Sequence, residues 1–292
     1  MMKKILSIAL ALALMLMWCA APAEESAWEN ILLLGTDLGS GREFGRSDTM
    51  IVLSINRETN KVKMTSIMRD TWVHLGEGHG DNKINAATVF GGPDMAMKMV
   101  NENFGLDIEK YALVDIAGLV AVIDAIGGID IEITEAEMMY LNNHTIDTVT
   151  DIGMEAEIAP LEAFGMVHLC GAQAVQHARD RMVGSDYQRV ERQRAVILAI
   201  VNKVRSECDV AELVAIITGL LEHVSTNFTI TEIMGLASLA FEIDMTSIEQ
   251  FRVPADGTYT SSVEDAVWRI NADFAENARL LDEFITGAEA AE

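Results

Sequence analysis

The stretch Met50-Ile-Val-Leu-Ser-Ile55 leads into the polar segment Asn56-Arg-Glu-Thr-Asn60 and then into a second apolar run, Val62-Lys-Met-Thr-Ser-Ile67. Val, Ile and Thr are enriched in strands, and a short polar connection between two such runs is typical of a β-hairpin. Upstream of the hairpin, Ile31-Leu-Leu-Leu34 is a short apolar run that ends at Gly35-Thr-Asp37. A run of this length, bounded by a turn signal, predicts a buried strand. The first part of the chain therefore supplies three strands of a sheet.

Strands and helices alternate along the rest of the chain. Helical patterns cover about residues 91–104, 118–126, 135–142, 190–204 and 211–223, and further strand patterns cover 111–116 and 129–134. This alternation predicts an α/β fold, a three-layer α/β/α sandwich with a central mixed sheet. Residues 142–166 have the least regular pattern, so we expect a surface excursion there. We expect residues 28–286 to form a single domain and residues 287–292 to be a frayed tail.

The N-terminus has the pattern of an export signal. Met1-Met-Lys-Lys4 is positively charged, and an uncharged, largely apolar run follows from Ile5 to Ala23. Ala21-Pro-Ala23 matches the small residues of a cleavage site, but the run is also long enough for a membrane anchor. We therefore expect residues 1–23 to be a signal peptide or a signal-anchor. The rest of the chain is then extracytoplasmic, in the cell envelope, and either membrane-anchored or secreted.

The chain is strongly acidic. It carries 45 Asp and Glu residues against 21 Lys and Arg, a formal net charge of −24. This balance argues against nucleic acid as a partner, because proteins bind duplexes through basic surface that releases counterions. Beyond the leader only Cys170 and Cys208 remain. Their spacing leaves both a disulfide and two free thiols open.

Against this acidic background, one segment is dense in arginine: between His177 and Arg194 lie Arg179, Arg181, Arg189, Arg192 and Arg194 itself. If His177-Ala-Arg-Asp-Arg181 is extended, Arg179 and Arg181 share one side of a strand. Ser185-Asp186 predicts a helix N-cap, and Arg189, Arg192 and Gln193 would share one face of the following helix. Guanidinium groups match phosphate oxygens in pairs, so the cluster predicts a phosphate or diphosphate site. The alternative is a set of structural arginines paired with carboxylates.

Charged side chains also stand where predicted strands begin or end. Arg46 and Asp48 lie on the same side of the chain at the mouth of one strand, and Asp37 follows the end of the neighbouring strand. Open α/β sheets place their ligands at strand ends. Two carboxylates together with substrate phosphate oxygens suit a magnesium ion. A loop-ordering Asp-Arg pair is the alternative.

A further strand repeats this pattern. Ser66-Ile-Met-Arg-Asp-Thr71 places Arg69 and Asp70 at the end of the hairpin's second strand, and Lys83 follows in Asp81-Asn-Lys-Ile-Asn85. Lys83 would add another cation to the site, or it would be a solvated loop lysine. Repetition of Arg and Asp at several strand ends, in a chain poor in arginine, favours a shared anion site.

Taken together, these strings resemble the LytR-CpsA-Psr family, in the correct order over roughly residues 30–286. The resemblance rests on Gly45-Arg-Ser-Asp-Thr-Met50, Ser66-Ile-Met-Arg-Asp70, Lys83-Ile-Asn85, Leu169-Cys-Gly-Ala-Gln-Ala174, Arg179-Asp-Arg181, Asp186-Tyr-Gln-Arg-Val-Glu-Arg-Gln193 and Val253-Pro-Ala-Asp-Gly-Thr-Tyr259. It implies a cell-envelope enzyme with an α/β/α sandwich. The implied reaction transfers an anionic glycopolymer from a polyprenyl diphosphate carrier to peptidoglycan through a phosphodiester link, with Mg²⁺ or Mn²⁺ as cofactor.

The resemblance also implies roles for individual residues. Asp37 and Asp48 would hold the metal, and Asp48, Arg69 and Asp70 would be catalytic, with Asp48 positioning or deprotonating the attacking sugar hydroxyl. The diphosphate would be bound by Arg46, Arg69, Lys83, Arg179, Arg181, Arg189 and Gln193. Met68 departs from the family pattern, which usually has proline before the Arg-Asp pair.

The implied partners are the polyprenyl diphosphate-linked glycan, peptidoglycan and the membrane surface. A prenyl carrier needs an apolar groove, and the stretches Ala96–Phe104 and Val114–Ile126 hold enough Val, Ile, Leu and Met to line one, although core packing would explain them equally well. Two alternative functions stay open. One is a noncatalytic module that binds polyprenyl diphosphates or anionic polymers, and the other is a hydrolase of lipid diphosphates.

Overall fold

The computed structural model describes residues 27–37, 44–154, 157–180, 182–183, 186–219, 221, 223–244 and 247–287. The predicted leader (1–23), Arg181 and the tail from residue 288 onward lie outside the described residues. Among the helices of the described part, none is both long and apolar enough to cross a membrane. Cys170 and Cys208 are free thiols.

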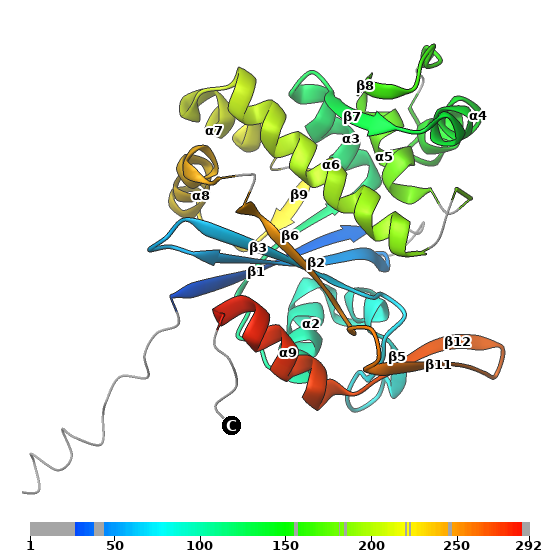
Figure 1. The fold of residues 1–292 in the computed structure, drawn as a ribbon, viewed down its shortest axis with the longest axis vertical. Helices are drawn as coiled ribbons and strands as arrows, with labels where there is room; N and C mark the ends of the chain where they lie inside the picture. Colours follow the sequence, from blue (N-terminus) through cyan, green and yellow to red (C-terminus); the bar gives the residue numbers. More distant parts are fainter. Residues whose placement is uncertain are drawn as a thin grey trace, which may run out of the picture.

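The centre of the fold is a six-stranded mixed sheet (Figure 1) with the order β10-β3-β2-β1-β6-β9. Its strands are β1 (Trp28–Thr36), β2 (Ser47–Asn56), β3 (Lys61–Ile67), β6 (Lys110–Asp115), β9 (Val224–Thr226) and β10 (Glu249–Val253). β2 pairs antiparallel with both β1 and β3, so the predicted hairpin is confirmed. β6 runs parallel to β1, β10 runs parallel to β3, and β9 is antiparallel to β6.

Alternation along the strands divides the core between the two faces of the sheet. Leu32 and Leu34 belong to the cluster that also contains residues of α2 (Ala87–Phe104) and α9 (Phe274–Thr286). Ile31 lies in a different cluster, with Leu239 of α8. On that opposite face lie α6 (Asp186–Glu207), α7 (Val210–Gly219) and α8 (Ile230–Glu242), as Figure 1 shows. The predicted α/β/α sandwich is confirmed.

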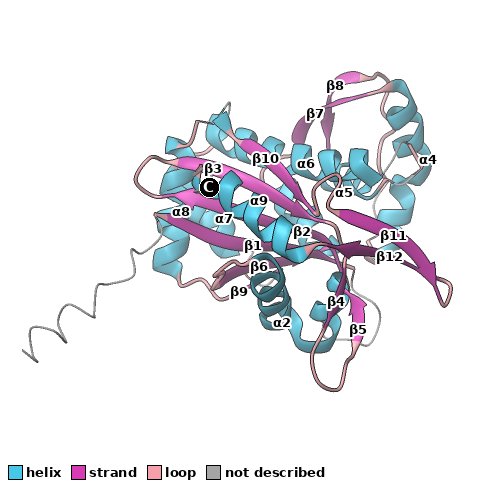
Figure 2. Ribbon diagram, turned by 60° about the horizontal axis from the view of Figure 1, so that its bottom comes forward, coloured by secondary structure: helices cyan, strands magenta, loops and turns pink. Residues whose placement is uncertain are grey.

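The remaining elements extend this sandwich. Above the sheet in Figure 1 lie α3 (Ile116–Ala125), α4 (Glu135–Asp151) and α5 (Gly171–Arg179), next to the antiparallel ribbon of β7 (Ile129–Ile133) and β8 (Gly165–Leu169). Two more ribbons, β4 (Trp72–His74) with β5 (Asp81–Lys83) and β11 (Tyr259–Glu264) with β12 (Val267–Ala272), project from the other side (Figure 2). A short 3₁₀ turn, η1 (Ile84–Ala86), joins β5 to α2. The strand predicted at 129–134 therefore exists, but it is not part of the central sheet.

Helix α4 corrects one expectation. We expected an irregular excursion from residue 142 to 166, but α4 continues to Asp151. The helix begins at a capping box in which Thr134 and Glu137 satisfy each other's backbone amides. Leu141, Thr145 and Thr148 then follow at helical spacing and are buried. This buried stripe holds the second half of the helix in place.

The segment 177–181 corrects a second expectation. We considered it as extended, but α5 is helical from Gly171 to Arg179. Ala174, Val175 and Ala178 pack into the core cluster formed with α3 and α6, and this one-sided burial selects the helix. Strand alternation therefore does not align Arg179 with the residues that follow it. The next helix, α6, begins at Asp186, close to the predicted start; Ser185 of the predicted N-cap lies outside the described residues.

Candidate functional site

A cavity of about 540 Å³ opens at one end of the sheet, between the ends of β1, β2 and β6 and the helices α3 to α6. Six of the predicted site residues line it: Asp37, Asp48, Arg69, Arg179, Arg189 and Gln193. They come from five separate parts of the chain, namely the ends of β1, β2 and β3 and the helices α5 and α6, so the fold assembles them. A smaller pocket of about 20 Å³ adjoins this cavity and shares four of these residues, Asp48, Arg69, Arg189 and Gln193.

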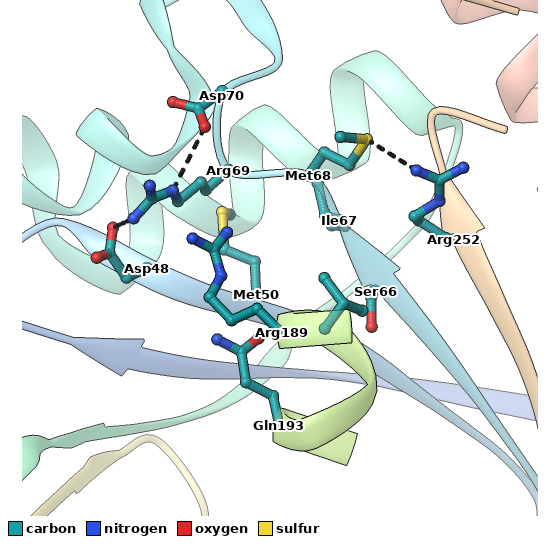
Figure 3. A pocket seen from close by; sticks show the side chains of 11 residues that line it. Asp48, Met50, Ser66, Ile67, Met68, Arg69, Asp70, Arg189, Gln193 and Arg252 are labelled. Atoms are coloured by element: carbon teal, nitrogen blue, oxygen red, sulfur yellow. Dashed lines mark hydrogen bonds and ion pairs between the residues drawn. The ribbon is translucent and has the colours of Figure 1, made fainter. Parts of the chain in front are cut away.

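A chain of alternating charges crosses the floor of the site (Figure 3). Arg69 Nη1 lies 2.7 Å from Asp48 Oδ1, and Arg69 Nε lies 3.4 Å from Asp70 Oδ2. Asp70 in turn contacts Lys83, whose Nζ is 2.5 Å from Asp70 Oδ1. Asp70 is buried, with 7% of its surface exposed. Two carboxylates thus hold one guanidinium and one ammonium group in place without a ligand.

Arg46 and Lys83 take different places from the one predicted. Neither is among the residues that line the cavity. Arg46 Nη1 donates a hydrogen bond to Asn85 Oδ1 at 3.1 Å, and Lys83 binds Asp70. Each therefore touches a residue that supports the cavity wall. Their direct contact with a diphosphate stays a prediction.

The opposite wall carries Arg179, Arg189 and Gln193. Arg189 and Gln193 are four residues apart on α6 and share one face of the helix, and Figure 3 shows both beside Arg69. Arg179 stands at the C-terminus of α5, where its Nη2 lies 3.0 Å from Asp151 Oδ2 and its Nη1 donates to Thr148 Oγ1 at 3.4 Å. Guanidinium groups from two helices therefore face the charged floor.

Two of the five clustered arginines have a structural role, which corrects the expectation that the cluster converges on one anion. Arg192 is buried and donates from Nη2 to the carbonyl of Asp180 at 2.7 Å and from Nη1 to the carbonyl of Val183 at 3.0 Å. Arg194 is also buried and donates to Ser66 Oγ at 2.9 Å and to Gln250 Oε1 at 3.2 Å. These side chains tie α6 to its preceding loop and to the sheet.

A buried histidine lies beside Arg192. The pKa of His177 is lowered to about 4, chiefly by burial; Glu137 and Asp180 act to raise the pKa and Arg192 acts to lower it. Burial raises the pKa of Glu137, but hydrogen bonds with Thr134 outweigh that effect and the net shift is downward. His177 is therefore neutral at physiological pH, and its charge is not available to the site.

Sequence reasoning missed the wall that α4 supplies. Tyr140, Asp147 and Asp151 all line the cavity, and their spacing of seven and four residues puts them on one helical face. The spacing of these residues is visible in the sequence, but the irregular pattern after residue 142 hides the second half of the helix. Asp115 was missed as well; it caps α3 by accepting a hydrogen bond from Gly118 N at 2.6 Å.

Asp37 and Asp48, the residues predicted to hold a magnesium ion, lie beside the same backbone carbonyl. The backbone amides of Asp37 and Asp48 both donate to the carbonyl of Arg46 at 3.1 Å, and both residues line the cavity. Within the described ranges, no group of three or more His, Cys, Asp or Glu side chains could hold a metal. Mg²⁺ commonly binds one or two carboxylates and completes its coordination with water and phosphate oxygens. Magnesium binding by Asp37 and Asp48 stays a prediction.

A second cavity, of about 430 Å³, is lined almost entirely by apolar side chains. It lies between the sheet and the helices α6, α7 and α8, where Leu33, Leu53 and Val201 are among its lining residues. Val122 of α3 and Ile126, the C-cap of that helix, line this cavity, whereas residues of Ala96–Phe104 lie in the core cluster on the other face of the sheet. The Ala96–Phe104 stretch is therefore core packing, and a prenyl groove at the other stretch stays a prediction.

The sequence profile of the LytR_cpsA_psr family matches residues 19–282. The chain belongs to the LytR_cpsA_psr family. Among its relatives is the polyisoprenyl-teichoic acid–peptidoglycan teichoic acid transferase TagU of Bacillus mycoides (strain KBAB4), which is 31% identical over 242 residues, or 82% of this chain and 72% of that protein. The TagU of Oceanobacillus iheyensis is 36% identical over 215 residues, covering 71% of this chain and 61% of that protein.

Solved structures agree with the fold of this LytR_cpsA_psr protein. The crystal structure of B. subtilis TagV superposes with a TM-score of 0.69 at 26% sequence identity, over 88% of this chain and 97% of TagV. TagT bound to LI-WTA gives a TM-score of 0.68 at 21% identity, over 89% of this chain and 90% of TagT, a likeness of fold alone.

Proposed function

We propose that this chain is an extracytoplasmic transferase that moves an anionic glycopolymer from a polyprenyl diphosphate carrier to peptidoglycan through a phosphodiester link. Family membership and the activity named for the TagU relatives support the reaction class. The site supports the substrate class, because a cavity with several arginines suits a diphosphate. The membrane surface is the expected place of action, since the carrier is a lipid.

The observation that carries the proposal is that the polar and apolar cavities follow one another along the same elements. On β1, Leu33 lines the apolar cavity and Gly35 the polar one. On α6, Arg189 and Gln193 line the polar cavity. Ile197 and Val201 follow Gln193 by about one and two helical turns and line the apolar cavity. An amphipathic ligand with a diphosphate head and a long apolar chain matches this order.

The chain's own residues can support the chemistry at the head. A hydroxyl oxygen of peptidoglycan would bond to the phosphorus that carries the glycan, and the bond from that phosphorus to the bridging oxygen would break, with polyprenyl phosphate leaving. Asp48, a carboxylate at the cavity wall, would take the hydroxyl proton. Arg69, Arg179 and Arg189 would stabilise the charge on the phosphate oxygens. Because carboxylates already hold Arg69 and Arg179 in place, these two need little reorganisation.

A metal would add to this stabilisation. We propose Asp37 and Asp48 as its ligands; when bound, Mg²⁺ or Mn²⁺ neutralises charge on phosphate oxygens. Proton transfer and substrate orientation are tasks of the side chains named above.

The test is a transfer assay with a lipid diphosphate-linked glycan and peptidoglycan fragments, in which the products are identified by mass spectrometry. We expect Asp48→Asn and Arg69→Ala each to lower kcat by about a hundredfold or more. Arg279→Gln is the matched control, because Arg279 is an exposed residue of α9 that pairs with Glu276. Carrier release without any acceptor would favour the hydrolase. Tight binding without turnover would favour the noncatalytic module.

A further inference from the structure

Asn85 is a buried polar residue to which the proposed function gives no role. It lies in the 3₁₀ turn η1, only 3% of its surface is exposed, and it belongs to the Lys83-Ile-Asn85 string of the sequence. A buried amide must satisfy several hydrogen-bonding groups at once, and its partners therefore show what its position depends on.

The side chain of Asn85 contacts two predicted site residues at the same time. Its Oδ1 accepts a hydrogen bond from Arg46 Nη1 at 3.1 Å, and its Nδ2 donates to Asp48 Oδ1 at 3.3 Å. Asp48 Oδ1 is also the atom that pairs with Arg69 Nη1. The amide thus stands between a guanidinium group and a carboxylate that belong to residues only two positions apart in the chain.

The backbone around Asn85 fastens this arrangement to the site. Asn85 N donates to the carbonyl of Arg69 at 3.3 Å, and its own carbonyl accepts from Ser47 Oγ at 3.4 Å. One helical turn later, Thr88 Oγ1 accepts from Ser47 N at 3.1 Å and donates to the carbonyl of Gly45 at 2.8 Å. The turn before α2 is therefore bound to both strand ends that carry the site.

We propose that Asn85 is a positioning residue that keeps Arg46 and Asp48 in separate hydrogen bonds, so that Asp48 stays paired with Arg69 at the cavity wall; this rests on the proposed function for its catalytic consequence. A neutral amide is suited to the task, because it accepts from the guanidinium and donates to the carboxylate. Arg46 and Asp48 lie on the same side of the chain and carry opposite charges. Without the amide of Asn85 between them, they would attract each other directly. A direct pair would draw the carboxylate away from Arg69.

The first experiment compares kcat and KM of Asn85→Ala with those of the wild type in the transfer assay. Hydrogen bonds to charged groups are worth enough for kcat to fall about ten- to a hundredfold, while KM for the lipid substrate changes by less than about threefold, because the arginines on α5 and α6 remain. Asn277→Ala is the matched control: Asn277 is fully buried and hydrogen-bonds Ala255 N and Thr258 Oγ1 far from the cavity. That variant loses thermal stability but keeps kcat per folded molecule.

The second experiment separates positioning from a merely structural role. In an Arg46→Ala background the direct pair cannot form, so the further change Asn85→Ala should lower kcat by less than about threefold. An equal loss of kcat in both backgrounds overturns the proposal. So does wild-type kcat in Asn85→Ala.

A third measurement does not depend on activity and so distinguishes this proposal from the proposed function. A crystal structure of Asn85→Ala should show Arg46 within salt-bridge distance of Asp48 and a longer contact from Asp48 to Arg69. If the wild type transfers no glycopolymer but this rearrangement is seen, the function fails and the positioning role stands. If Arg46 and Asp48 keep their places in the variant, the positioning role is refuted whatever the activity.

Discussion

Asp70 offers the sharpest test of the charge network that Asp48, Arg69, Asp70 and Lys83 form beside the cavity. It is the shared partner of Arg69 at 3.4 Å and of Lys83 at 2.5 Å, and Asn has nearly the same shape. The change Asp70→Asn therefore removes one negative charge and leaves the packing in place. Two cations then face one remaining carboxylate, that of Asp48.

The expected loss follows from how buried the group is. Removing one partner of a fully buried ion pair costs about 3–5 kcal/mol. The side chains of Asp70, Arg69 and Lys83 are 10%, 16% and 23% exposed, so solvent screens part of the interaction and we expect a loss of about 2–3 kcal/mol in the free energy of unfolding. For a domain of this size, that corresponds to a fall in Tm of roughly 5–10 °C.

The assay is urea unfolding and thermal melting of the wild type, Asp70→Asn, Lys83→Met and the double variant. The double variant should lose less than the sum of the single losses, because Lys83→Met removes one of the cations that Asp70→Asn leaves uncompensated. Asp130→Asn serves as control, since Asp130 pairs with His168 on the exposed β7–β8 ribbon and should change stability by less than about 0.5 kcal/mol. A Tm of Asp70→Asn within 1 °C of the wild type, or strictly additive losses, would refute the reasoning.

Two further predictions concern the apolar cavity and the buried histidine. Val201→Trp fills part of the apolar cavity, so KM should rise about tenfold or more for a long-chain prenyl diphosphate substrate and little for a short-chain analogue; equal KM changes for both would contradict the assigned path. The pKa of His177 is about 4 in the fold and 6.5 ordinarily, so the unfolded chain binds more protons between these values and stability must fall as the pH drops from 6.5 towards 4. The free energy of unfolding, measured with urea, should be about 2 kcal/mol lower at pH 4.5 than at pH 7 because of His177. The variant His177→Gln should not show this loss. The same loss in that variant would show that other groups cause it.

The strands at the centre of the fold were predictable because their signals are local. β-branched runs on either side of a short polar turn specify the β2–β3 hairpin without reference to distant residues. The apolar run at Ile31–Leu34 likewise predicts a strand from its own residues alone. The six-stranded order was not predictable, since the parallel pairing of β10 with β3 joins segments about 180 residues apart.

The helical segments show where local signals fail. The five residues His177-Ala-Arg-Asp-Arg181 place two arginines two positions apart, and so short a pattern suits either a strand or a helix end. Burial of Ala174, Val175 and Ala178 against α3 and α6 selects the helix, and that packing is a tertiary fact.

The arginines illustrate the same limit inside the candidate site. Arg189 and Arg192 lie three residues apart on α6, and the sequence gives no reason to separate them. Their roles differ because the carbonyls of Asp180 and Val183 fold back onto Arg192, whereas Arg189 lines the cavity. Residue type and spacing predict that a cation is present, but the path of the loop before the helix decides whether its guanidinium group meets a backbone carbonyl or a ligand.

The charge balance of the cavity bears on the proposed metal. Among the lining residues that the structure describes are five aspartates, Asp37, Asp48, Asp115, Asp147 and Asp151, against three arginines, Arg69, Arg179 and Arg189. The formal balance is −2, so carboxylates outnumber the arginines that a diphosphate entering this cavity would meet, and two of these arginines, Arg69 and Arg179, are already paired with aspartates. A divalent cation shared between the strand-end carboxylates and the phosphate oxygens would cancel that excess of negative charge where the ligand binds. In a chain this acidic, the arginines of this cavity supply geometry and hydrogen bonds, and the proposed divalent cation would offset the excess of carboxylates beside the diphosphate.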